Sequence, residues 1–134
     1  AITPRSGPII IEINYRIPPA AARAFYQLMQ QAQSIRQRNG AYDWSISRDL
    51  ADSESWTERF SCPTWLDYLR QRTRSTQADR LVLDAGLAMH IGPEPVVVRR
   101  MLERPVGSVR WRDDTPDPGP TTPIPVTTYP GGGT

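Results

Sequence analysis

The 134-residue sequence contains no lysine, a single cysteine, a single histidine and two phenylalanines. One cysteine cannot form an internal disulfide bond, so we expect Cys62 to be a small buried thiol in a protein of a reducing compartment. The lone His90 cannot supply the three or four donors that a zinc site needs. We therefore predict no metal and no cofactor.

Long hydrophobic runs are also missing. The longest, Ile9 to Ile11, is far shorter than the roughly 20 apolar residues that span a bilayer. No basic segment followed by an apolar stretch marks a signal peptide. The formal net charge is only +2, and no basic blocks alternate with aromatic residues. These absences argue against membrane insertion of this segment and against nucleic-acid binding.

Hydrophobic periodicity predicts the first half of the fold. Residues 9–17 alternate apolar and polar side chains, which is typical of a strand, and residues 20–38 repeat apolar side chains at helical spacing. Residues 41–49 and 55–62 alternate again and are predicted to form a hairpin. In the first of these strands we expect Tyr42 and Trp44 on the same face.

The second half is predicted to contain two helices and a final strand. One helix opens at Pro63, and another covers residues 76–90, where Thr76 and Asp79 have the spacing of a capping box. Residues 95–103 return to extended structure. The order is βαββαβ with an extra helix before the last strand, which predicts a ferredoxin-like α+β fold.

The chain is predicted to divide into three parts: a linker at 1–7, the α+β domain at 8–103 and a tail at 104–134. The tail is rich in proline and glycine, and we expect it to be disordered. Both faces of the predicted strands carry apolar or aromatic residues, but helices cover only one face of such a sheet. We therefore predict a homodimer in which two sheets pack face to face.

A set of positions spread over residues 8–103 resembles one family, the C-terminal domain of bacterial major facilitator superfamily permeases of the transmembrane secretion effector type, which are similar to enterobactin exporters. The matched positions are Arg36, Arg38, Gly40, Ala41, Trp44, Arg48, Asp49, Glu58, Trp65, Leu69, Arg70, Gln71, Thr76, Asp79 and Arg80, with Tyr15, Arg16, Pro19 and Phe25 fitting the lead-in.

The resemblance implies a dimeric α+β barrel, the fold group that also contains antibiotic-biosynthesis monooxygenases. It also implies a cytoplasmic domain behind the membrane helices of a transporter, attached through them to the inner membrane, or a freestanding relative. The sequence departs from the family where helix histidines are often found, because Tyr68 and Arg72 to Arg74 stand at those places. Any family function that needs those histidines is not expected here.

The candidate ligand-binding residues are Asn14, Trp44, Trp65 and His90. Aromatic side chains could line a pocket for a flat ligand, with Asn14, Trp65 and His90 as polar donors. The alternative is that the aromatic residues form core and dimer interface and that His90 ends a helix. No catalytic residue is predicted. The matched residues Arg38, Gly40, Arg48, Asp49, Arg70, Thr76, Asp79 and Arg80 are expected to be structural.

Two functions follow from these observations. The first is an accessory domain of an exporter that serves assembly or regulation, with itself and the membrane domain of the same transporter as partners. The alternative is a small cofactorless monooxygenase-like enzyme or a small-ligand-binding protein of the same fold. A cavity lined by Asn14, Trp65 or His90 would favour the alternative, because a sealed interface has no room for a ligand.

Overall fold

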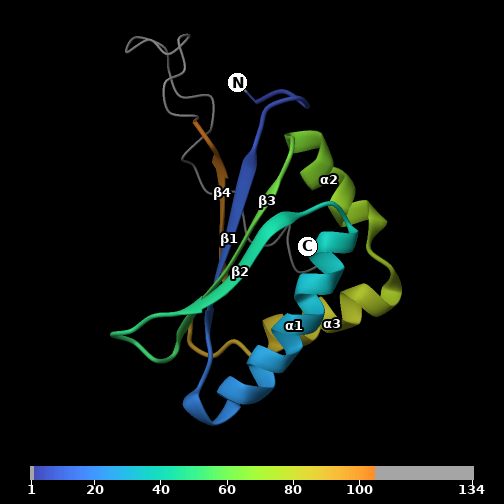
Figure 1. Ribbon diagram of the computed structural model, residues 1–134. Coiled ribbons are helices and arrows are strands. Elements are labelled where there is room, and N and C mark those ends of the chain that lie inside the picture. The colour runs from blue at the N-terminus through green and yellow to red at the C-terminus, as the bar shows by residue number, and fades with distance from the viewer. Residues whose placement is uncertain (1, 105–134) are drawn as a thin grey trace.

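The computed structural model describes residues 2–104, and these form one α+β unit (Figure 1). The predicted tail falls almost entirely outside the described residues. The elements, in chain order, are β1 (Ile9–Arg16), a short 3-10 turn (Pro19–Ala21), α1 (Ala22–Arg38), β2 (Tyr42–Arg48), β3 (Ser55–Cys62), α2 (Trp65–Arg74), α3 (Gln77–Ala88) and β4 (Val97–Leu102). This is the predicted order, including the extra helix before the last strand.

The helix ends follow from local sequence. Pro18 and Pro19 stop β1 and open the turn that leads into α1, since proline suits a first helical turn. Gly40, with φ of 108°, ends the connection after α1 in a conformation that glycine adopts without strain. The Thr64 side chain caps α2 by accepting from the Asp67 amide. Each boundary therefore has a cause within a few residues.

The four strands form one antiparallel sheet in the order β2-β3-β1-β4. The central strand β1 pairs with β3, where Ile11 lies opposite Phe60, and with β4, where Ile11 lies opposite Arg100. Because side chains alternate along a strand, this register places the odd-numbered residues of β1 and the even-numbered residues of β3 and β4 on one face. The remaining residues of these strands lie on the opposite face.

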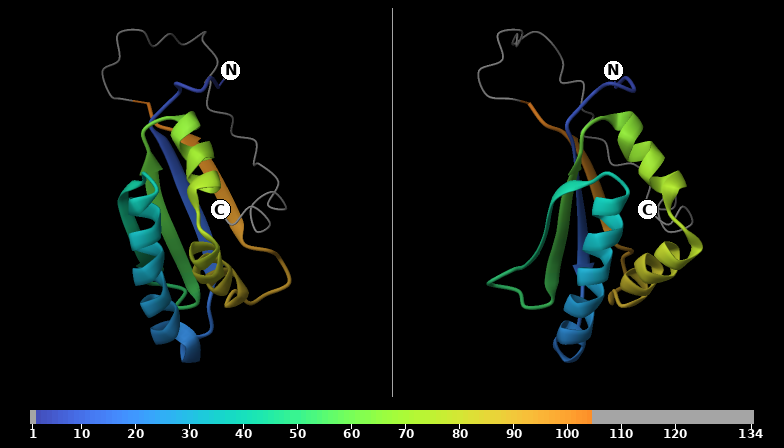
Figure 2. Two further views of the ribbon diagram at one scale, coloured as in Figure 1. Left: turned by 90° about the vertical axis from the view of Figure 1, so that its right-hand side faces the viewer. Right: turned by 45° about the vertical axis from the view of Figure 1, so that its right-hand side comes forward.

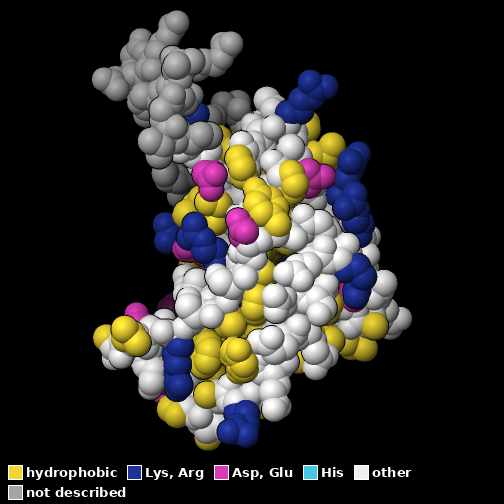
Figure 3. Space-filling view, in the orientation of Figure 1, with side chains coloured by type: hydrophobic (Ala, Val, Ile, Leu, Met, Phe, Trp, Pro, Cys, Tyr) yellow, Lys and Arg dark blue, Asp and Glu magenta, His cyan; other side chains and the backbone are white. Residues whose placement is uncertain are grey.

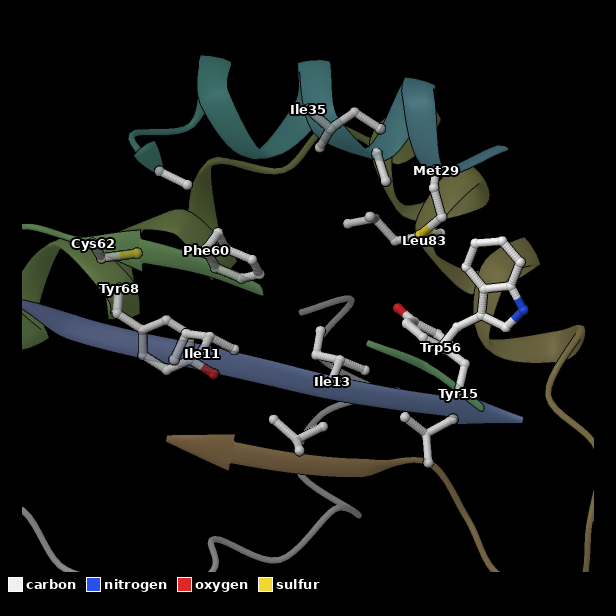
Figure 4. Packing of buried hydrophobic residues seen from close by; sticks show 14 of the residues in the cluster. Ile11, Ile13, Tyr15, Met29, Ile35, Trp56, Phe60, Cys62, Tyr68 and Leu83 are labelled. Atoms are coloured by element: carbon white, nitrogen blue, oxygen red, sulfur yellow. The ribbon is translucent and has the colours of Figure 1, made fainter. Parts of the chain in front are cut away.

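All three helices lie on the first of these faces, and no helix of the described residues covers the other (Figure 2). The core fills the space between sheet and helices (Figure 4). Phe25 is fully buried in it, with its ring centroid 5.0 Å from that of Tyr15 and 5.5 Å from that of Trp56 in edge-on contacts. The fully buried Ile11 and Ile13 of β1 form its floor.

The sheet departs from the predicted alternation in β2. A register shift between Tyr42 and Ser45 coincides with a positive φ of 53° at Asp43. Tyr42 therefore pairs with Ser61 on the face without helices, whereas Trp44 points to the helix side. The prediction that Tyr42 and Trp44 share a face was wrong, because an extra residue in one strand reverses the alternation.

The segment before β1 packs against the start of α2. The carbonyl oxygens of Ser6 and Pro4 accept hydrogen bonds from the backbone N–H groups of Trp65 (2.7 Å) and Leu66 (3.0 Å). A side chain at Gly7 would collide with the Pro63 carbonyl, so the close approach of these two segments depends on glycine. Among the described residues, none of the helices has the length and apolar character required to cross a membrane.

Candidate functional site

The most heavily buried polar group of the domain is the carboxylate of Glu58, in the middle of β3. Its side chain is inaccessible to solvent, and donors from three other elements surround it. Tyr15 of β1 donates its hydroxyl to Oε1 (2.9 Å), and Trp44 of β2 donates its indole N–H to Oε2 (2.9 Å). Arg36 of α1 donates Nε to Oε2 (3.0 Å) and Nη2 to Oε1 (3.4 Å). Both oxygens are thus used.

Glu58 remains ionised in this environment. Burial by itself would raise the pKa of Glu58, but the Arg36 charge and the hydrogen bonds from Arg36, Trp44 and Tyr15 outweigh burial and lower the pKa. Arg36 is buried as well, and its guanidinium carbon lies 4.7 Å from the centroid of the Phe60 ring. A carboxylate held by so many donors is a poor general base, so this network joins elements rather than transferring protons.

A second link, between α3 and α1, joins the buried Asp79 to Arg38, whose side chain is largely exposed. Asp79 completes the predicted capping box with Thr76, and it accepts a hydrogen bond from the Arg38 guanidinium. Burial would raise the pKa of Asp79, but hydrogen bonds from Arg38 and from the Thr76 amide outweigh this effect and lower the pKa. Arg38, Thr76 and Asp79 therefore dock two helices that are far apart in sequence.

The other matched residues also have local structural contacts or lie in solvent. Asp49 accepts from the amides of Ala51 and Asp52, which closes the hairpin turn, and Arg48 Nε donates to the Ser53 carbonyl (2.6 Å). Arg70 is exposed, and Arg80 is exposed on α3. Figure 3 shows arginine side chains along the outer side of the helical layer near α2.

One described cavity, of about 260 Å³, lies where the connection from α3 to β4 crosses the end of β1. It brings together two of the predicted ligand-binding residues, Asn14 and His90, with Ser55, Glu94 and Val97 among the other lining residues. The cavity is open and mostly apolar.

Both ring nitrogens of His90 are engaged by the protein. Nδ1 accepts the backbone N–H of Arg16 (2.8 Å), so it carries no proton, and Nε2 lies 2.8 Å from the Glu94 carbonyl oxygen, to which it donates. The imidazole thus fixes the connection to the end of β1. Asn14 is engaged too, because its Oδ1 accepts from the Thr57 hydroxyl (2.8 Å).

The other two predicted ligand-binding residues lie elsewhere. Trp44 belongs to the Glu58 network, and Trp65 begins α2, where its ring centroid is 5.4 Å from that of Tyr68. The four residues are therefore distributed over three places, and the ligand-binding prediction remains a prediction. Among the described residues, no cluster of three or more histidine, cysteine or acidic side chains is arranged to hold a metal ion.

The sequence analysis named Arg36 and Glu58 as matched positions but did not predict that they form a buried ion pair, and it did not single out Arg100 on the helix side of β4. Glu58 alternates with Trp56 and Phe60, and Arg100 follows Val98 in the same way. A charged residue at an apolar position of an alternating strand was the available signal, because such a residue faces the core.

Comparison with solved structures shows the fold. A proposed antibiotic biosynthesis monooxygenase of Caulobacter crescentus superposes with a TM-score of 0.64 at 13% identity, covering 75% of this chain and 93% of that one. A second such protein, of Bordetella bronchiseptica, superposes with a TM-score of 0.59 at 16% identity and covers 73% of this chain and 99% of its own. Rv0793 of Mycobacterium tuberculosis superposes with a TM-score of 0.60 at 12% identity and covers 76% of this chain and 100% of its own. These are ferredoxin-like α+β proteins, as the sequence predicts.

Comparison at the level of sequence shows the family. No protein with a curated description matches this chain significantly. The profile of the transmembrane secretion effector family, however, matches residues 1–106, which is most of the chain and includes every element of the sheet and helices. The chain therefore belongs to the transmembrane secretion effector family of the major facilitator superfamily.

Proposed function

We propose that this domain is an accessory module of a major facilitator exporter and that it pairs with a second copy of itself through the helix-free face of its sheet. The observation that carries the proposal is that this face spans four strands and that no helix of the described residues covers it. A sheet with one uncovered face commonly buries that face in a partner when it carries apolar side chains.

The register arranges the helix-free face in rows that run across the sheet. One row consists of Tyr42, Ser61, Ile10 and Met101, and is largely apolar. In the next row Glu12 lies between two arginines, with its oxygens 2.6 Å from Arg59 and 3.6 Å from Arg99.

The composition of these rows suits contact with the same face of a second copy of the domain. Tyr42 exposes 39% of its surface and Val97, in a third row, exposes 47%, so apolar area remains to be covered. The charged row carries both signs, so a two-fold related copy can place acidic against basic groups. This differs from the expected source of pairing, since the large aromatic residues Trp56 and Phe60 lie on the helix side.

A steric variant tests the pairing. Thr57 lies on the helix-free face of β3, next to the centre of the sheet, and Thr57→Arg would place a long charged side chain there. The matched control is Gln30→Arg, which adds the same side chain to the exposed surface of α1. Light scattering should give a dimer for the parent chain and the control but a monomer for Thr57→Arg. Equal masses for both variants would contradict pairing through this face.

The cytoplasmic position of the domain, behind an N-terminal transporter, is part of the same proposal and rests on family membership. In inside-out vesicles that contain the complete protein, added protease should remove the domain. In right-side-out vesicles the domain should survive. Digestion with the opposite sidedness would place it on the other side of the membrane.

A second candidate function, a cofactorless monooxygenase-like enzyme or a ligand-binding protein, is favoured by the cavity beside Asn14 and His90. Its weakness is that the protein already occupies both His90 nitrogens. His90→Ala separates the two functions when it is assayed with phenolic substrates and oxygen. Turnover by the parent that is lost in the variant would support the enzyme, whereas an absence of turnover in both would remove this candidate.

A further inference from the structure

Arg100 is a cation on the buried side of the edge strand β4. It lies opposite Ile11 of β1, between Val98 and Leu102 on the same face. Its Nε donates a hydrogen bond to the Tyr68 hydroxyl of α2 (2.8 Å). The side chain therefore extends from the sheet edge into the space between β4 and α2.

Within the described part of the chain, the two terminal nitrogens of Arg100 have no hydrogen-bond partner. Nη1 and Nη2 are each exposed by less than 1 Å². The other buried unpartnered side-chain atoms of the described residues belong to the neutral side chains of Asn39, Trp56 and Gln71. A buried charge without a partner is costly, and in folded proteins such groups are normally paired.

Arg36 shows what this fold supplies when a buried guanidinium has a structural role. Its side chain faces the Glu58 carboxylate, which takes two of its N–H groups. Among residues 2–104, the Arg100 guanidinium has its hydrogen bond and its ring contact with Tyr68 alone, whose ring centroid lies 5.6 Å from the guanidinium carbon. The acidic residue of α2, Asp67, accepts instead from the Thr64 hydroxyl (2.8 Å).

The Tyr68 ring beside Arg100 is one of an aromatic pair. Trp65 packs 5.4 Å from Tyr68, centroid to centroid, and both Trp65 and Leu102 are only partly buried. Figure 4 shows the Tyr68 side chain extending from α2 toward β1. A ligand at this place would meet a planar fork of N–H donors, the Tyr68 hydroxyl proton and an aromatic surface.

We propose that Arg100 and Tyr68 bind the carboxylate of a small ligand whose aromatic or apolar body packs against Trp65. A guanidinium fork fits a carboxylate with two parallel hydrogen bonds, and this supplies the partners that Nη1 and Nη2 lack. The site lies on the helix side of the sheet, so it is separate from the proposed pairing face. It does not rest on the proposed function, and either can fail alone.

The first experiment titrates the complete chain with benzoate and follows tryptophan fluorescence and heat. Saturable binding is expected, with a dissociation constant on the order of 1 mM for so small a ligand. Benzamide, which is the same size but neutral, and inorganic phosphate should each bind at least tenfold more weakly. An absence of benzoate binding, or equal binding of benzamide, would overturn the proposal. Tighter binding of phosphate would overturn the assignment to an aromatic carboxylate.

Two neighbouring arginines give a matched pair of variants. Arg100→Gln should weaken benzoate binding at least tenfold, whereas Arg99→Gln, on the opposite face of β4, should change it less than twofold. Equal losses in both variants would show general electrostatic attraction and contradict the site.

Thermal unfolding separates a ligand site from a structural arginine. Without ligand, Arg100→Met should melt at or above the parent temperature, because it removes an unpaired buried charge. Benzoate should raise the melting temperature of the parent but not of this variant. A ligand-free variant that melts lower by more than about 5 °C would assign Arg100 a structural role instead.

Discussion

The replacement Glu58→Gln should strongly destabilise the domain. The two oxygens of Glu58 accept four hydrogen bonds, one from Tyr15, one from Trp44 and two from Arg36. Glutamine retains one acceptor oxygen and turns its amide NH₂ toward donors, so at least two of these bonds are lost. The variant also removes the negative charge that faces the buried guanidinium.

The magnitude follows from the burial of both partners. Removing one member of a buried ion pair costs about 3–5 kcal/mol, compared with roughly 5–15 kcal/mol for the total stability of a domain. With a urea dependence of roughly 1.5 kcal/mol per molar, the unfolding midpoint should fall by about 2–3 M. The buried Trp56 and the partly buried Trp44 make tryptophan fluorescence a suitable probe.

Glu12→Gln is the matched control. Glu12 also accepts from arginine, but Arg59 exposes 48% of its side chain, so the pair is at the surface. This variant should cost about 1 kcal/mol or less. If Glu58→Gln also cost less than about 1 kcal/mol, the Glu58 network would not be the tie between sheet and α1 that the geometry indicates.

Three further predictions concern titratable and docking groups. Because folding lowers the pKa of Glu58, the stability that this carboxylate contributes is complete above its ordinary pKa of 4.5 and is lost as the pH falls below that value. The free energy of unfolding of the parent should therefore decrease with pH in this acidic range, and that of Glu58→Gln should lack this contribution. Burial raises the pKa of the Cys62 thiol to about 11, so a thiol reagent at pH 8 should react only at the rate of unfolding, and fast labelling of native protein would contradict this. Asp79→Ala removes the α3 cap and the contact with Arg38, and should cost roughly 1–2 kcal/mol by urea unfolding, whereas an unchanged midpoint would show that neither contact stabilises the fold.

The sequence predicted the elements well because their signals are local. The alternation of β1, the apolar stripe of α1 and the box formed by Thr76 and Asp79 each lie within one segment. The prediction of a buried thiol at Cys62 is confirmed for the same reason. The bulge at Asp43 has no such signal, because a positive φ at an aspartate becomes favourable only when the paired strand fixes it.

The site was harder to predict because its contacts join distant segments. Glu58 meets Arg36 and Tyr15 only when register and helix docking bring three elements together. Asn14 and His90, by contrast, were predicted as ligand donors and do lie beside one cavity. Their hydrogen bonds to neighbouring groups could not be foreseen, since the connection that carries His90 has no periodic pattern.

The mass of the chain in solution tests the central claim most directly. Sedimentation equilibrium at tens of micromolar protein should give twice the 15.1 kDa of the single chain for the parent and 15.1 kDa for Thr57→Arg. A parent chain that sediments as a monomer would contradict pairing through the helix-free face, and with it the proposed assembly role.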